Sequence, residues 1–223
     1  MAVLGYAALI RLAPLRDVIE DGLDPVGTFL GPREEDLWVR CVTQKRKVEF
    51  LGGRIAGKLA ANMYRVAAGT FPKSWNAVEI FPQGNGRPVC EHDDGLRHSI
   101  SISHSSSWAL ALVSSDRSTV AVDIEDSHSR VRPMADMFHE VEISQIRTLK
   151  DARLRWTLKE VYGKLTGWGV QGLTRDIITL RLADGLWLAI PPWISMAESS
   201  ILAVNHWGPL TVAIGVSARA QET

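Results

Sequence analysis

The pattern of apolar and polar positions predicts several helices along this chain of 223 residues. The helical period is clearest over residues 46–67, where apolar side chains recur every three or four positions. That stripe consists of Val48, Leu51, Ile55, Leu59, Met63 and Val66. Residues 152–166 repeat the pattern, and weaker helices are expected over 32–43 and 134–149. We expect the stripes to be buried and the cations of the first helix to lie on its polar flank: Arg46, Lys47, Arg54 and Lys58.

Alternating or short apolar runs predict strands between these helices. They cover residues 1–15, 78–81, 98–115 as a hairpin, 120–125, 177–182, 186–190, 201–205 and 210–216. Strands and helices occur in the same order before and after about residue 116, although no residue-level repeat is visible. We therefore expect an α+β protein of two similar halves, residues 1–116 and 117–223. Each half would pack an antiparallel sheet with helices, and the active site would lie in the cleft between them.

The composition narrows the classes of function. The 25 basic and 25 acidic side chains cancel, so no broad field attracts nucleic acid or an anionic membrane. Cys41 and Cys90 have neither the spacing of a zinc site nor the density of a disulfide scaffold, and we expect them to be reduced. The apolar start lacks the features of a signal peptide, and no segment reaches the roughly 18 apolar residues of a membrane span. These features favour a cytoplasmic protein.

Acidic residues at two places indicate a candidate site. Asp123 and Glu125 point to the same side of a strand, about 7 Å apart. Glu160 follows Lys159 and lies one helical turn before Lys164. Either feature alone is ordinary, since surface strands often carry such acid pairs and Glu160–Lys164 has the spacing of an exposed salt bridge. Together they predict a hard cation such as Mg²⁺ held by three carboxylates, with lysines available for phosphate.

Several short motifs, in a fixed order, resemble those of one enzyme family. A G-x-D-[IV]-E strand is matched at Ala121–Glu125, and a W-x-x-K-E-x-x-x-K helix at Trp156, Lys159, Glu160 and Lys164. Upstream lie Gly86-Arg87-Pro88, Ser103-His104-Ser105 and a basic helix with Arg46 and Arg54, and Phe138 with Glu142 resembles an F-x-x-x-E segment. The chain is similar to the 4′-phosphopantetheinyl transferases of the surfactin-synthetase-activating (Sfp-like) superfamily.

The resemblance implies an activity and its participants. Such enzymes transfer 4′-phosphopantetheine from coenzyme A to a serine of an apo acyl or peptidyl carrier protein, in a Mg²⁺-dependent reaction that releases 3′,5′-ADP. Carriers of this kind serve fatty-acid synthesis and secondary metabolite biosynthesis, and the sequence does not choose between them. Because one chain shows two halves, we expect a monomer. The carrier is expected to bind near residues 131–138.

The resemblance also implies roles for individual residues. Mg²⁺ would be held by Asp123, Glu125 and Glu160, and Glu160 would accept the serine proton directly or through a metal-bound water. Lys164 would stabilise the departing phosphate. The remaining residues implied in coenzyme A binding are Arg46, Arg54, Arg87, Pro88, Ser103, His104 and Lys159. Lys58 is a weaker candidate.

Two departures from the family pattern bear on these expectations. Ala121 replaces the usual Gly, a change between small residues. Gly163 replaces a larger residue, and because Gly in a helix costs about 1 kcal/mol relative to Ala, we expect a loose turn at Lys164.

Two other functions fit parts of the pattern. A D-x-E pair with a nearby lysine also occurs in Mg²⁺-dependent nucleases and phosphohydrolases, but a nuclease should carry a basic groove with interleaved aromatics. A coenzyme A-binding or carrier-binding module without activity should lack an acid or lysine of the motifs, and none is missing.

Overall fold

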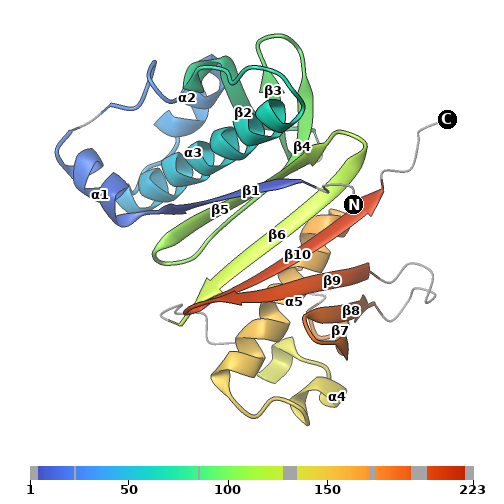
Figure 1. Ribbon diagram of the computed structural model, residues 1–223. Helices are drawn as coiled ribbons and strands as arrows, with labels where there is room; N and C mark the ends of the chain where they lie inside the picture. The colour runs from blue at the N-terminus through green and yellow to red at the C-terminus, as the bar shows by residue number, and fades with distance from the viewer. Residues whose placement is uncertain are drawn as a thin grey trace. The chain divides into compact units, whose positions relative to one another are not determined.

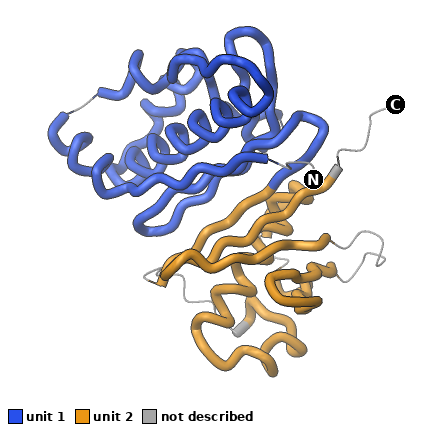
Figure 2. Tube along the Cα trace, in the orientation of Figure 1, with its two compact units in different colours: residues 1–120, 218–223 blue, residues 121–217 orange. Residues whose placement is uncertain are grey.

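The computed structural model describes residues 5–22, 24–84, 86–127, 135–170, 174–191 and 200–218 (Figure 1). The chain divides into two compact units: unit 1 comprises residues 1–120 with 218–223, and unit 2 comprises residues 121–217 (Figure 2). The division falls within one strand, β6 (Ser118–Asp126). Each unit has its own sheet and its own long helix.

Unit 1 contains an antiparallel sheet of order β1-β5-β4-β3-β2. Its strands are β1 (Tyr6–Arg11), β2 (Val78–Pro82), β3 (Pro88–His92), β4 (Arg97–His104) and β5 (Trp108–Ser115). Its helices are α1 (Ala13–Glu20), α2 (Pro32–Val39), α3 (Gln44–Ala67) and the 3₁₀ helix η1 (Trp75–Ala77).

The long helix α3 packs on this sheet through small residues. Ala56, Ala60 and Ala61 are fully buried in the same apolar cluster as Ile80 and Val113 of the sheet. At Gly57 the side chains of Ile80 and Ile100 already fill the space that a Cβ would need, with Ile100 Cδ1 only 2.8 Å away. A larger residue would therefore separate the helix from the sheet.

Unit 2 repeats this topology with the sheet order β6-β10-β9-β8-β7. After β6 its strands are β7 (Ile178–Ala183), β8 (Leu186–Ile190), β9 (Ser200–Trp207) and β10 (Leu210–Ala218). Its helices are η2 (Ala135–Met137), α4 (Glu140–Ile143) and α5 (Leu149–Thr166). The predicted α+β fold with two similar halves, each an antiparallel sheet packed with helices, is confirmed.

Helix α5 is capped at its N-terminus and buries one face in unit 2. Thr148 Oγ1 accepts a hydrogen bond from Asp151 N, and the Asp151 carboxylate accepts one from Thr148 N. Leu158, Val161 and Tyr162 are fully or almost fully buried and pack with Ala121 of β6 in one apolar cluster. The helix is therefore fixed against the strand that carries the acidic pair.

Several predicted elements differ from the structure. The helix expected over 134–149 is instead η2 and the short α4, because capping bonds begin one helix at His139 and a new one at Thr148. The strand expected over 1–15 is shorter, Tyr6–Arg11, and the chain continues from Ala13 as helix α1. Within the described ranges, no helix has both the length and the apolar composition to cross a membrane.

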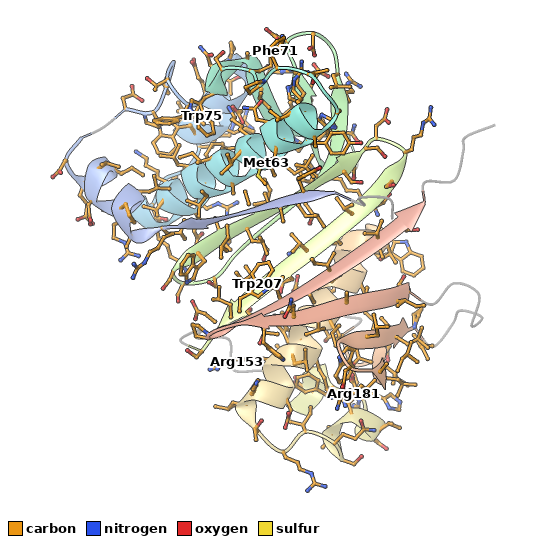
Figure 3. The ribbon with its side chains drawn as sticks, in the orientation of Figure 1. Met63, Phe71, Trp75, Arg153, Arg181 and Trp207 are labelled. Carbon is orange, nitrogen blue, oxygen red and sulfur yellow. The ribbon has the colours of Figure 1, made fainter. Side chains whose placement is uncertain are left out.

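The predicted burial of α3 is wrong in two respects. Leu59, Met63 and Val66, expected in the core, are 37, 41 and 57% exposed (Met63 is labelled in Figure 3). Lys58, expected on the polar flank, is fully buried. The prediction from the large side chains was wrong because the helix packs on the sheet through its Ala and Gly residues instead.

Candidate functional site

Strand β6 presents Asp123 and Glu125 on the face that packs against α5. Ala121 of this strand lies in the apolar cluster with Leu158 and Val161 of α5, and residues two apart along a strand share a face. Asp123 and Glu125 are 6 and 8% exposed, so both carboxylates are largely removed from water. Two buried acids on one strand require a positive partner.

Lys164 of α5 supplies positive charge to this strand. Its Nζ donates to Asp123 Oδ1 at 2.7 Å and to the Val122 carbonyl at 3.0 Å. The Lys164 side chain is 30% exposed, so the ion pair lies at the edge of the protein interior, within reach of a ligand. The structure thus brings together a strand acid and a helix lysine that are 41 positions apart.

Glu160, one turn before Lys164, completes this group. Burial raises the pKa of its carboxyl above the usual range, the charge of Asp123 raises the pKa further, and Lys164 acts in the opposite direction. Mutual influence of this kind means that the three groups lie within electrostatic range of one another. A half-buried carboxyl with a raised pKa is suited to accept a proton near neutral pH.

The donor chemistry of this group fits a hard divalent cation. Asp123 and Glu160 are oxygen donors, and their repulsion is what a cation would relieve. Asp123, Glu125 and Glu160 do not form a preformed metal site. Within the described ranges, no three or more His, Cys, Asp or Glu side chains are close enough together to hold a metal ion. Lys164 is instead the partner of Asp123.

Lys164 stands on a well-defined turn, contrary to the loose turn expected from Gly163. The carbonyl of Gly163 accepts backbone hydrogen bonds from Gly167 at 3.0 Å and from Gly169 at 3.2 Å, so the chain folds back over the helix end. A Cβ on Gly163 would lie only 2.7 Å from the Gly169 carbonyl carbon. Gly163 is therefore the residue that permits this close return of the chain.

Two basic side chains of unit 1, Arg46 and His104, lie near the start of α3. Thr43 caps the helix by accepting from Arg46 N, and the Arg46 side chain is 60% exposed. Glu49 Oε2 lies 3.8 Å from Arg46 Nη1 and 3.9 Å from Nε2 of His104, the last residue of β4. The sequence reasoning missed Glu49, although its spacing from Arg46 is that of a helix ion pair.

The predicted loop residues lie toward the same end of the unit 1 sheet. The β2–β3 turn is closed by the bond from Gln83 N to the Arg87 carbonyl at 2.8 Å, and Pro88 begins β3. Since Val89 pairs with Ser99, this turn projects in the direction in which β4 continues to Ser103 and His104. Gly53 of α3 lies against Ile102, so the start of the helix is also at this end.

Arg54 is more buried than the sequence suggested. Its Nε lies 3.3 Å from Glu34 Oε1, and its guanidinium stacks 4.1 Å from the centre of the Phe50 ring. Burial lowers the pKa of Arg54, and Glu34 partly offsets this. Arg46 also lies within electrostatic range of Arg54. Arg54 is thus anchored on one side by an acid that sequence reasoning had not identified.

The two candidate lysines Lys58 and Lys159 are not placed to bind phosphate. Lys58 is fully buried and donates to the carbonyls of Phe29 and Trp75 and to Glu34. Lys159 is also fully buried, and its Nζ donates to Glu142 at 2.6 Å and to two backbone carbonyls. Each ammonium group has three hydrogens and three acceptors, so the geometry favours a structural role for both lysines.

Glu142 is the acid of the F-x-x-x-E segment that faces the interior. Its side chain is fully buried, whereas that of Glu140 is 82% exposed. Phe138 is also buried. Of the segment expected to recognise the carrier, residues 131–134 lie outside the described residues.

No protein-family model matches this chain. The chain is 35% identical over 91 residues to the holo-[acyl-carrier-protein] synthase of Shouchella clausii (strain KSM-K16), a match that covers 39% of this chain and 74% of that relative. The synthase of the same name from Halalkalibacterium halodurans is 28% identical over 112 residues, which cover 49% of this chain and 91% of the relative. This chain is therefore almost twice as long as the latter.

Among solved structures, a holo-(acyl-carrier-protein) synthase from Bacillus anthracis in complex with CoA (3′,5′-ADP) has a TM-score of 0.41 and 25% sequence identity. The superposition covers 51% of this chain and 97% of that one.

Proposed function

Since this chain belongs to the holo-[acyl-carrier-protein] synthase family and is a phosphopantetheinyl transferase, we propose that it transfers 4′-phosphopantetheine from coenzyme A to a serine of an apo carrier protein. The other product is 3′,5′-ADP. The observation that carries the proposal is the group of Asp123, Glu160 and Lys164, which combines two carboxylates and an ammonium group at one place in unit 2.

The proposed reaction needs a base for the serine hydroxyl. Glu160 takes this role, because its half-buried carboxyl group lies within electrostatic range of Asp123 and Lys164. Lys164 supports this role, because its charge acts against the rise in the pKa of Glu160. Lys164 also stabilises the negative charge that develops on the departing phosphate.

We propose that the reaction depends on Mg²⁺ held by Asp123, Glu125 and Glu160. The oxygen-only donor set and the repulsion between Asp123 and Glu160 support this choice of metal. When bound, Mg²⁺ would offset the negative charge of the coenzyme A pyrophosphate. The side chains of the chain itself hold the metal, accept the proton and neutralise the phosphate.

Coenzyme A binding is assigned to unit 1. Arg46, Arg87 and His104 are the proposed contacts to the nucleotide phosphates, with Ser103 and Pro88 shaping the backbone near them. Arg54 is a further proposed contact, through the part of its guanidinium group that does not face Glu34. Arginine suits this purpose because its planar fork makes paired hydrogen bonds to phosphate.

We place the chain in the Sfp-like subtype of these transferases. Two features support this: the ordered motifs over residues 46–164, and a length almost twice that of the matched Halalkalibacterium relative, with two units of the same strand order. We propose that one chain suffices for activity, as a monomer, which light scattering of the active protein would test.

The deciding experiment incubates the protein with coenzyme A, Mg²⁺ and a panel of apo acyl and peptidyl carriers, and weighs each carrier by mass spectrometry. A gain of one phosphopantetheine arm on the carrier serine, abolished by chelation of Mg²⁺, is expected. A full panel of unmodified carriers would reject the transferase proposal, and modification that survives chelation would reject the metal assignment. Hydrolysis of coenzyme A without carrier modification would favour a phosphohydrolase.

A further inference from the structure

A buried network around Glu142 fixes α5 in unit 2. Lys159 Nζ donates to Glu142 Oε2 at 2.6 Å, to the Thr174 carbonyl at 2.6 Å and to the Met137 carbonyl at 3.2 Å. Arg155, one turn earlier, lies 3.4 Å from Glu142 Oε1. We call Glu142, Arg155, Lys159 and Thr179 the Glu142 network.

Backbone groups complete the Glu142 network. Glu142 Oε2 accepts from His139 N at 3.1 Å, which caps α4, and Glu142 Oε1 accepts from Thr179 N at 3.0 Å and Thr179 Oγ1 at 2.5 Å. One buried carboxylate therefore joins α4, α5 and the edge strand β7. Because Lys159 and Glu142 have no exposed surface, a hydrogen bond lost here is not replaced by water.

The same network occurs in unit 1 around Glu34. Lys58 Nζ donates to Glu34 Oε2 and to the carbonyls of Phe29 and Trp75, and Arg54 Nε lies 3.3 Å from Glu34 Oε1. Glu34 also accepts from Gly31 N at 3.1 Å and from Ile80 N at 3.0 Å. We call Glu34, Arg54 and Lys58 the Glu34 network.

The two networks share four spacings along the chain, although the acid and the lysine are 24 positions apart in unit 1 and 17 in unit 2. In both, the arginine precedes the lysine by four positions. The acid follows the helix N-cap residue, whose backbone N–H it accepts from, by three positions, and it follows the residue of the first carbonyl acceptor by five. The residue of the second carbonyl acceptor precedes the strand residue whose amide donates to the acid by five positions in both. These residues are Trp75 and Ile80 in unit 1, and Thr174 and Thr179 in unit 2. This is the residue-level repeat that was not visible in the sequence.

The repeat separates structural residues from reactive ones. Lys159 is followed by Glu160 and, five positions on, by Lys164, whereas Lys58 is followed by Leu59 and, five positions on, by Met63. The network is thus present in both units, but the acid and lysine of the proposed site are present only in unit 2. Since consecutive helix residues are about 100° apart around the axis, anchoring Lys159 also sets the direction of Glu160.

We propose, on the basis of the proposed transferase function, that the Glu142 network is the positioning device of the reaction: it holds α5 in the rotation that directs Glu160 and Lys164 at Asp123. Its residues do not touch the substrates. The Glu34 network holds α3 in the same way and so positions Arg46 for the nucleotide. Loss of the first network should therefore lower kcat, and loss of the second should raise the KM for coenzyme A.

The test compares the double variants Glu142→Gln/Lys159→Met and Glu34→Gln/Lys58→Met, which remove both charges and keep similar volumes. At a temperature at which circular dichroism shows both folded, the unit 2 pair should lower kcat at least tenfold with the KM for coenzyme A within twofold. The unit 1 pair should raise that KM at least fivefold with kcat within twofold. Amide hydrogen exchange should increase in α5 and in α3, respectively.

A milder set of variants applies if either double variant fails to fold. Thr179→Val removes only the hydroxyl that donates to Glu142, and Thr179→Ser retains it. We expect Thr179→Val to lower kcat several-fold without changing the KM for coenzyme A, and Thr179→Ser to keep the parental kcat.

Two results would overturn the positioning role. One is a Thr179→Val variant that keeps the parental kcat although amide exchange in α5 is faster. The other is the same change in kcat and KM in both double variants. A parent protein that modifies no carrier would instead reject the proposed function, and the positioning role with it.

Discussion

Lys164 Nζ lies 2.7 Å from Asp123 Oδ1 and so joins the last turn of α5 to the strand β6. The same ammonium group donates to the carbonyl of Val122, the residue before this acid. A lysine with two acceptors on a strand has a defined position, and Glu160 lies on the same face of the helix one turn earlier. The proposed chemistry follows from this contact, since it places an ammonium group within electrostatic range of two acids that repel each other.

Asp123→Ala should abolish transfer while the protein remains folded. The change removes a proposed metal ligand and the partner of Lys164, and we expect a loss of at least about a hundredfold in kcat, the size seen when a charge-stabilising group is removed from an active site. The fold should tolerate it, because the repulsion of Glu160 is relieved and Lys164 is partly exposed. Carrier mass gain against time measures the effect.

The matched control is Asp184→Ala, which removes a fully solvated acid of the same unit. It should leave the transfer rate unchanged. Turnover by Asp123→Ala within threefold of the parent would remove Asp123 from the site.

Arg54→Ala should raise the KM for coenzyme A and also lower stability. A hydrogen bond to a charged group is worth about 1.5–3 kcal/mol, so the proposed phosphate contact predicts a rise in KM of roughly ten- to a hundredfold. Stability should fall because Glu34 loses one partner of its buried network. Steady-state kinetics and thermal unfolding measure the two effects separately.

Arg155→Ala is the equivalent change in unit 2 and provides the comparison for Arg54→Ala. It should also lower stability, because Glu142 is fully buried, but it should act on kcat and leave the KM for coenzyme A near the parental value. An unchanged KM in Arg54→Ala would mean that Arg54 serves only the interior of unit 1.

Gly163→Ala should destabilise unit 2 although Ala is the better helix former. The new methyl group would lie 2.7 Å from the Gly169 carbonyl carbon and 2.8 Å from a Val170 methyl carbon. Overpacking of this kind costs about 1–3 kcal/mol, which offsets the propensity gain of about 1 kcal/mol. Thermal unfolding should show a lower midpoint, and transfer should slow because the turn of Lys164 is displaced.

Gly84→Ala is a suitable reference for that experiment, since nothing lies within 4 Å of the position that its Cβ would take. Its midpoint should match that of the parent. A raised midpoint in Gly163→Ala would show that the returning chain can move aside.

The stability of unit 1 should fall in mild acid because of His92. Burial, together with the charges of His98 and Arg65, lowers the pKa of His92 to about 4. Between pH 6.5 and 4 the unfolded chain binds a proton at this residue and the folded chain does not, so stability decreases as the pH falls. The contribution is at most about 1.4 kcal/mol per pH unit.

His92→Phe keeps an aromatic ring against His98, whose ring centre lies 5.1 Å from that of His92, but it removes the titrating group. Denaturant unfolding of the variant and the parent at pH 7, 5.5 and 4.5 should show a smaller acid loss for the variant. Parallel pH profiles would mean that His92 does not contribute to the acid sensitivity.

Periodicity and local motifs were enough to predict most of the fold. The helix over 46–67 and the strands at 78–81, 120–125 and 186–190 correspond to α3, β2, β6 and β8, because each has a long or regular pattern. The prediction of one helix over 134–149 was wrong. Capping bonds at His139 and Thr148 determine where the helices of this segment begin, and the apolar spacing does not show them.

The sequence by itself determined the order of the motifs, the pairing of acids on β6 and the presence of Glu160 and Lys164 on one helix face, since these depend only on local spacing. The tertiary structure decided which cations are available to a ligand. Lys58 and Lys159 resemble surface lysines in the sequence, but each meets an acid 24 or 17 positions away in the interior. Burial and partners arise from contacts between distant segments, and local spacing carries no information about them.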